Sequence, residues 1–198
     1  MFWAAYILDQ SDGILLGTSP VQHPDDMDVE FPQADISDQP NDAHSASSLE
    51  GLEYFRQLCQ LSYLKGKVYF EIYCPRKDVT PLVFCKRVCE LHAELEEWWE
   101  NFPFKDPFGR GSTESDYLTK FSSVGLQAMY YNCLIMTHRI VPRINLIIMR
   151  TPRMWRSPSD IATVERQTPI STSICLTAAR DTLKLVNHVP WSDVALAW

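Results

Sequence analysis

Apolar residues recur at intervals of three and four along most of the chain, which is the spacing that lines one face of an α-helix. We expect helices over residues 1–16, 49–74, 80–102, 117–138 and 170–188. No stretch alternates apolar and polar residues in the way that a half-buried strand does. The pattern therefore predicts an all-α fold, an irregular multi-helix bundle.

The segment 80–102 is the clearest of these helices, because Thr80 can cap its first turn and Pro81 suits its first helical position. Its apolar stripe is expected to run through Cys85, Val88, His92, Leu95, Trp99 and Phe102. Residues 117–138 are apolar on nearly every side, which places them at the centre of the bundle. Pro142 is expected to break the helical stretch that follows.

A long acidic segment separates the first two predicted helices. Residues 18–48 contain four prolines, seven acidic residues and no lysine or arginine, and they end in the run SASS. Prolines and small polar residues favour turns over regular structure. The sequence therefore predicts a long acidic loop, and a loop of this length inside a compact domain calls for a functional explanation.

Composition narrows the classes of function. The chain has 198 residues, which suits one domain, and its net charge of −7 argues against broad electrostatic binding to nucleic acid. The six cysteines form no C-x-x-C pair and lie in apolar stretches, as reduced thiols of an intracellular protein do. The longest uncharged run, residues 121–137, is short for a membrane span and carries polar side chains, so no membrane association is expected.

The acidic segment raises the question of a metal site. Asp25, Asp26 and Asp28 lie close together, and carboxylates aimed at one point hold Mg²⁺, often for a diphosphate substrate. A helical Mg²⁺-dependent enzyme acting on a diphosphate is therefore one alternative function. Prolines flank the cluster, however, and no second acidic motif with ligand spacing occurs elsewhere in the sequence. A solvated surface loop is the favoured interpretation.

Soft ligands also gather on the helix predicted at 80–102. Cys85, Cys89 and His92 fall on one helical face and could begin a zinc site, with a fourth ligand from Cys59 or Cys133. The same positions belong to the apolar stripe. Buried thiols beside a hydrogen-bonded histidine are therefore favoured over a metal site, and we predict no metal or cofactor residues.

Basic residues concentrate between positions 117 and 159, where no acid occurs. This stretch could bind nucleic acid or another anion, or it could pair with the acidic loop or a partner domain. No nucleophile motif such as G-x-S-x-G is present, and GRGST at 109–113 lacks the G-K-[ST] of a phosphate loop. We therefore expect no catalytic residues. The basic residues, with a tryptophan among them, are Lys120, Arg139, Arg143, Arg150, Arg153, Trp155 and Arg156.

Three sequence runs suggest a family. FWAAYILDQSDGILLGTSP at 2–20 is followed by DDMDVEFP at 25–32 and by YFRQLCQLSYLKGKVYFEIY at 54–73. Together they resemble the middle homology region of fungal transcription factors, a helical domain of regulators whose DNA-binding part is a binuclear zinc cluster. The matching positions are Trp3, Tyr6, Asp9, Leu16, Gly17, Pro20, Asp28, Val29, Pro32, Trp99, Pro103, Leu134, His138, Arg139, Cys175, Ala178, Ala179 and Arg180.

The sequence departs from the family pattern in three ways. The basic residue of the Gly-x-Pro turn is replaced by Thr18 or Ser19, and the proline after His-Arg is displaced to Pro142. The six closely spaced cysteines of the zinc cluster do not occur, so nothing in this sequence is expected to read DNA bases. Residues 1–198 therefore look like a partial, truncated regulatory domain, with the acidic loop at 18–48.

The resemblance implies a regulatory domain that acts in the nucleus and is not an enzyme. It would bind a protein partner or a small-molecule effector and would control an attached or associated DNA-binding module. In the acidic loop, Asp28 is expected to fix a turn by accepting backbone N–H groups. A non-functional truncated fragment is the remaining alternative, because cut helices would expose apolar faces, with Trp3, Trp191 and Trp198 near the termini.

Overall fold

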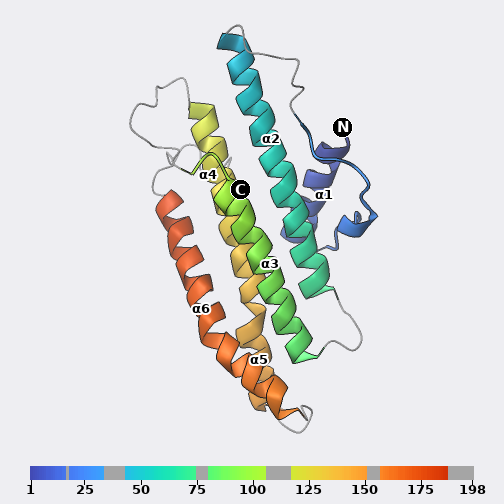
Figure 1. The fold of residues 1–198 in the computed structure, drawn as a ribbon, viewed down its shortest axis with the longest axis vertical. Helices are drawn as coiled ribbons and strands as arrows, with labels where there is room; N and C mark the ends of the chain where they lie inside the picture. The colour runs from blue at the N-terminus through green and yellow to red at the C-terminus, as the bar shows by residue number, and fades with distance from the viewer. Residues whose placement is uncertain (17, 34–42, 75–79, 106–116, 151–156, 187–198) are drawn as a thin grey trace.

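The computed structural model describes residues 1–16, 18–33, 43–74, 80–105, 117–150 and 157–186 (Figure 1). These residues form an all-α bundle, as predicted, and include no strand. A 3₁₀ turn, η1, covers Pro24–Asp26, and a π-helical turn, η2, covers Tyr69–Tyr73. The α-helices are α1 (Phe2–Leu16), α2 (Ala43–Val68), α3 (Pro81–Asn101), α4 (Tyr117–His138), α5 (Ile140–Arg150) and α6 (Pro158–Val186).

Helix α4 lies at the centre of the bundle, which confirms its predicted position. It contacts α2, α3, α5 and α6, whereas α1 packs on the outer side of α2. Figure 1 shows α5 continuing the course of α4, after which α6 returns along both. Of the described helices, none is long and apolar enough to cross a membrane. This arrangement brings α3, α4 and α6 side by side.

The bundle is held together by apolar side chains that the helical period places inward. Leu91 and Leu95 of α3 and Leu126 of α4 are almost completely buried. Burying a leucine side chain contributes about 1.5–3 kcal/mol to folding. The predicted stripe of α3 is shifted in its second half, because Leu91 and Trp98 are buried whereas His92 and Trp99 are only half-buried. That rotation turns His92 and Trp99 toward α4 and α6.

Two helix boundaries were predicted wrongly. Helix α2 begins at Ala43, so residues 43–48 are helical and do not belong to the acidic loop. Once the packed part of a helix has formed, each further residue adds one hydrogen bond, and the alanines of this segment favour that extension. Helix α6 begins at Pro158 although Pro169 lies inside it. Figure 1 shows α6 changing direction along its length, as an internal proline causes.

Pro142 also has a different place from the one predicted, because it lies inside α5 and does not break it. It is the third residue of that helix, where a backbone N–H needs no partner within the helix. The interruption falls earlier, at Arg139, between α4 and α5. A proline ring clashes with the carbonyl four residues before it, here that of His138. Pro142 therefore interrupts the helix before its own position, and α4 and α5 are two separate helices.

Helix α1 holds the described half of the acidic loop against α2. Asp9 accepts hydrogen bonds from the backbone N–H groups of Val21, at 3.0 Å, and Gln22, at 2.9 Å. The indole of Trp3 donates to the carbonyl of Glu30 at 2.9 Å. The expected role of Asp28 is therefore taken by Asp9, and the side chain of Asp28 is exposed. Charge-assisted bonds of this kind explain how an acidic segment stays ordered on the bundle surface.

Candidate functional site

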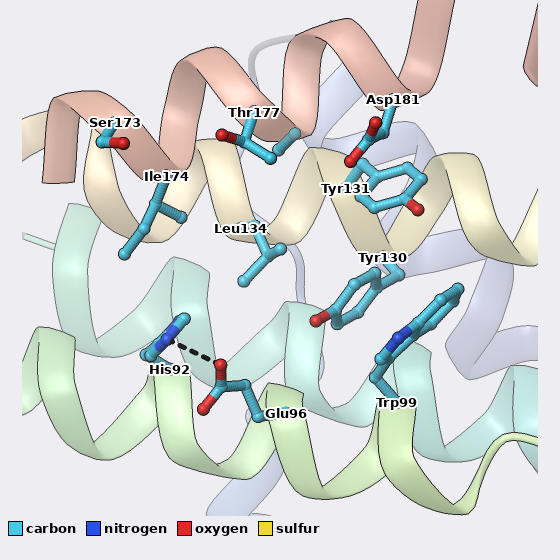
Figure 2. Close-up of a pocket in the computed structure, with 11 residues that line it drawn as sticks. His92, Glu96, Trp99, Tyr130, Tyr131, Leu134, Ser173, Ile174, Thr177 and Asp181 are labelled. Carbon is cyan, nitrogen blue, oxygen red and sulfur yellow. Dashed lines mark ion pairs between the residues drawn. The ribbon is translucent and has the colours of Figure 1, made fainter. Parts of the chain in front are cut away.

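A cavity of about 330 Å³ lies between α3, α4 and α6 (Figure 2). Three residues of α3 enter it from successive turns, so they share one side of that helix. Residues one turn apart on α6 face them, and α4 supplies the surface between. The lining residues are His92, Glu96, Trp99, Tyr130, Tyr131, Leu134, Ser173, Ile174, Thr177, Ala178 and Asp181.

Aromatic rings form one wall of the cavity. Trp99 stacks on Tyr130 with ring centroids 4.7 Å apart and planes 11° apart, and Tyr131 lies 5.9 Å from Trp99. Trp98 stacks on Tyr130 from the bundle core at 5.8 Å. Aromatic pairs of this kind each contribute about 0.5–1.5 kcal/mol beyond their burial, so the wall is held in place. The ammonium nitrogen of Lys105 lies 5.7 Å from the centre of the Trp99 ring.

A chain of four polar side chains runs from the cavity rim into the core. The Oε1 atom of Glu96 lies 3.2 Å from Nε2 of His92 (dashed in Figure 2), and Nδ1 of His92 lies 3.1 Å from Nε2 of His138. Nδ1 of His138 then lies 3.1 Å from Oγ of Ser171. This series of polar side chains joins α3 to the last residue of α4, and through it to α6. It therefore connects the cavity with the α4–α5 junction.

The direction of the two histidine hydrogen bonds depends on the tautomer of each ring. A neutral imidazole has one nitrogen that donates and one that accepts. When Nε2–H of His138 donates to Nδ1 of His92, Nδ1 of His138 accepts from the Ser171 hydroxyl, and the other tautomers reverse both bonds. Both hydrogen bonds are therefore made in either arrangement.

His138 stays neutral in this arrangement. It is 1% exposed. Burial, and then the neighbouring His92, lower its pKa to about 4. Ser171 is fully buried as well, so its hydroxyl does not reach a substrate carbonyl. These polar side chains therefore do not act as a nucleophilic triad. The arrangement instead fixes three helices relative to one another.

The charge of the cavity comes from two carboxylates. Glu96 on α3 and Asp181 on α6 are acidic, and none of the lining residues that the structure describes is lysine or arginine. Burial, and then the charge of Asp181, raise the pKa of Tyr131. Burial, followed by the charge of Glu96, likewise raises the pKa of Tyr130. The carboxylates thus act electrostatically on the aromatic wall.

The structure does not assemble the magnesium site considered from the sequence. The side chains of Asp25, Asp26 and Asp28 are exposed. The backbone N–H of Asp25 donates to Nδ1 of His23 at 3.1 Å, which shapes the turn η1. Within the described ranges, no group of three or more His, Cys, Asp or Glu side chains is placed to hold a metal ion.

The zinc ligands considered from the sequence do not form a group that could hold a metal ion within the described residues. Cys85 is buried as expected, whereas Cys89 is exposed, which corrects the expectation of a buried thiol there, and the ring of His92 lies against His138. Cys59 belongs to the cluster under α1, where burial raises its pKa to about 11. Burial raises the pKa of Cys133, in the main core, to about 12. Cys59 and Cys133 thus belong to two different clusters of buried side chains.

The basic stretch is described only in part. Arg139 donates from Nε to the Tyr73 hydroxyl at 2.8 Å, and its guanidinium lies 5.2 Å from the centre of that ring. Arg143 and Arg150 are exposed. The basic patch stays a prediction, because its other members (the side chain of Lys120, with Arg153, Trp155 and Arg156) lie outside the described residues.

Sequence reasoning missed this cavity. It placed His92 and Trp99 in the core stripe, and it gave His138 only as a position of the family motif. One feature of the sequence could have indicated a site on this helix. His92, Glu96 and Trp99 share a helical side that is neither apolar nor fully charged. Their meeting with Tyr130 and Asp181 depends on how three helices pack, which their separate patterns do not contain.

The chain is similar to two curated fungal proteins, each named an ABC-transporter-regulating transcription factor. It is 28% identical over 199 residues to the one from Aspergillus oryzae and 27% identical over 199 residues to the one from Aspergillus fumigatus. Each alignment covers 100% of this chain and 22% of the relative, so the chain spans about a fifth of the length of these relatives. No family model matches the chain. No solved structure matches it either.

These similarities agree with the sequence resemblance at the level of a fungal transcription factor. The link to a binuclear zinc cluster stays a prediction, and so does the assignment to the middle homology region.

Proposed function

We propose that this chain is a regulatory module of a fungal transcription factor, which controls transcription by binding a protein partner or a small-molecule effector. The observation that carries the proposal is the similarity of the whole chain to two proteins named as transcription factors. In this proposal residues 1–198 are part of a middle homology domain and act in the nucleus. The reading of DNA bases belongs to an attached or associated module.

The cavity between α3, α4 and α6 supports effector binding over partner binding alone. Small-molecule sites are concave, have volumes of about 300–1,000 Å³, and combine apolar and aromatic walls with a few polar groups. The cavity has a volume of about 330 Å³, an aromatic wall and an apolar floor that includes Leu134 and Ile174. Its position between packed helices of a bundle is also one where such sites occur.

The polar side chains from Glu96 to Ser171 couple binding of an effector in the cavity to the packing of the helices. His138 of α4 is bonded to His92 of α3 and to Ser171 of α6, so a ligand that favours one spacing of α3 and α6 also favours one arrangement of these bonds. His138 is the last residue of α4, so that choice acts on the α4–α5 junction. A ligand shifts such an equilibrium only through different contacts in the two states. Glu96 and the α6 residues of the lining are the groups through which a ligand makes such contacts.

A reporter assay tests the proposal. Residues 1–198 are fused to a heterologous DNA-binding module in a fungal host, and reporter output is compared for two tryptophan substitutions on α6. Thr177→Trp fills the cavity from its exposed rim, whereas Thr172→Trp places the same ring at an exposed position outside the cavity. We expect Thr177→Trp to change reporter output and Thr172→Trp to leave it as in the unmodified fusion.

The opposite result is equally clear. If the fusion and both variants give the output of the DNA-binding module alone, residues 1–198 do not regulate transcription. Circular dichroism of the purified variants shows whether each retains its helix content, so that loss of folding is recognised separately.

A further inference from the structure

We propose that the cavity between α3, α4 and α6 binds a small organic cation, a protonated or quaternary amine that carries an apolar group. The inference rests on the proposed function, because it names the chemical class of the effector.

The positions of the two carboxylates favour a positive charge in the cavity. Glu96 enters from α3 and Asp181 from α6, on opposite sides of the opening (Figure 2). Glu96 is 58% exposed and Asp181 is 28% exposed, so both reach the solvent at the rim. A cation between them is attracted by both, and an anion is repelled by both. The attraction exceeds that on an open surface because the helices exclude part of the water.

Existing partners of these carboxylates leave room for a ligand. Nζ of Lys184 donates to Asp181 at 2.6 Å, but its side chain is 73% exposed and lies one turn further along α6. An exposed ion pair of this kind contributes little to stability, so a ligand cation can replace it. On the other side, Oε1 of Glu96 lies 3.2 Å from Nε2 of His92. Within the described residues its second oxygen makes no hydrogen bond or ion pair, which leaves that atom for a ligand.

The tyrosine at the centre of the wall favours the same charge. Trp99 and Tyr130 stack face to face with centroids 4.7 Å apart, Tyr130 is also stacked on Trp98, and Nζ of Lys105 lies over the Trp99 ring, so these ring faces are taken up within the protein. Figure 2 shows the hydroxyl of Tyr130 directed into the cavity and Tyr131 beside Asp181. The Tyr130 oxygen, with its lone pairs, therefore faces a positive group that lies between Glu96 and Asp181.

The floor of the cavity determines what the rest of the ligand is. Leu134, Ile174 and Ala178 are apolar. Apart from the two carboxylates and the polar atoms of the aromatic wall, the polar groups of the described lining are His92 and the hydroxyls of Ser173 and Thr177. A bare inorganic cation would leave this apolar surface in contact with water. An apolar group attached to the amine covers this surface and removes it from water, which favours binding. The site thus fits an amphipathic cation.

Matched ligands test the charge directly. The purified chain is titrated by calorimetry with benzyltrimethylammonium, with its neutral isostere in which carbon replaces nitrogen, and with the anion phenylmethanesulfonate. We expect the cation to bind about tenfold more tightly than the neutral isostere, and its affinity to fall with rising salt. The anion is expected to show no heat of binding.

Matched variants test the location. Glu96→Gln and Asp181→Asn each remove one negative charge at the rim and are expected to weaken cation binding several-fold. Glu97→Gln and Glu165→Gln remove a charge from exposed positions of α3 and α6 outside the cavity, and they are expected to have little effect. These controls separate the local effect from the change in net charge.

The inference would be overturned by equal binding of the neutral isostere, by tighter binding of the anion, or by equal losses in the rim and control variants. If a neutral or anionic ligand binds and Thr177→Trp abolishes its binding, the effector function stands and only the cation is wrong. If none of the ligands binds, the inference is also wrong, and the reporter comparison decides separately on the proposed function.

Discussion

Replacing His138 with glutamine removes a buried ring that titrates, and the pH dependence of stability is expected to change in a defined way. The ring is 1% exposed and lies within hydrogen-bonding distance of His92 and Ser171. Its pKa in the folded protein is lowered from 6.5 to about 4. In the unfolded chain the ring is solvated and returns to the ordinary value.

The size of the effect follows from these two pKa values. Between pH 6.5 and about 4 the unfolded chain binds a proton on His138 and the folded chain does not. The free energy of unfolding is therefore undiminished above pH 6.5, falls as the pH is lowered through this window, and levels off below about 4. Between about pH 7.5 and about pH 5 the loss from His138 amounts to roughly 2 kcal/mol.

Urea unfolding followed by circular dichroism at the two pH values measures this loss. The unmodified chain is expected to lose about 2 kcal/mol more on acidification than His138→Gln does, because all other titrating groups contribute to both proteins. His23→Gln is the control, since His23 lies in the loop, with its ring tilted by 48° to that of Phe70 and the ring centroids 4.2 Å apart. It is expected to behave like the unmodified chain.

An identical pH dependence in the unmodified chain and His138→Gln would refute this reasoning. It would mean that the ring of His138 is charged or solvated in the folded protein, and the hydrogen-bonded chain between α3 and α6 would then not exist as described.

Two further predictions concern the packing of α1. Asp9→Asn is expected to destabilise the chain by about 1–3 kcal/mol, because two backbone N–H groups of the loop lose a charged acceptor. The control Asp26→Asn changes an exposed side chain and is expected to be near neutral. Urea unfolding measures both variants, and equal effects would contradict the role of Asp9. Gly66→Ala places a methyl group 2.5 Å from the Tyr6 hydroxyl and is expected to lower the free energy of unfolding by about 1–3 kcal/mol. Gly51→Ala places its methyl group where no atom lies within 4 Å, and it is expected to stabilise α2 by about 0.5–1 kcal/mol. Thermal unfolding distinguishes the two glycines, and a stable Gly66→Ala variant would show that α1 does not pack closely on α2.

The fold was predictable wherever one helix carries its own boundary signals. Residues 117–138 were placed correctly from their apolar pattern, and the start of α3 from Thr80 and Pro81. The first part of α6 was missed because Pro169 and the polar residues before it are typical of a helix end. Packing against α3, α4 and α5 outweighs that local preference, since most helical stability in a bundle comes from tertiary contacts.

The candidate site was not predictable in the same way. His92 was correctly expected to be a hydrogen-bonded histidine, but its partner His138 is 46 positions away and on another helix. The crossing angle of two helices, and bends such as the one in α6, determine which of their faces meet. The periodic pattern of apolar residues predicts neither of these features. The acidic cluster at 25–30 drew attention through composition alone, and the structure leaves its carboxylates in solvent.

The central claim is that the cavity of this bundle receives an effector and passes its binding to the α4–α5 junction. A two-dimensional ¹H–¹⁵N NMR titration of the chain with benzyltrimethylammonium tests it most directly. We predict saturable shift changes at lining residues such as Thr177 and Asp181 and also at His138 and Ser171, all of them lost in Thr177→Trp. Changes confined to the surface outside the cavity, or changes that persist in Thr177→Trp, would contradict the account.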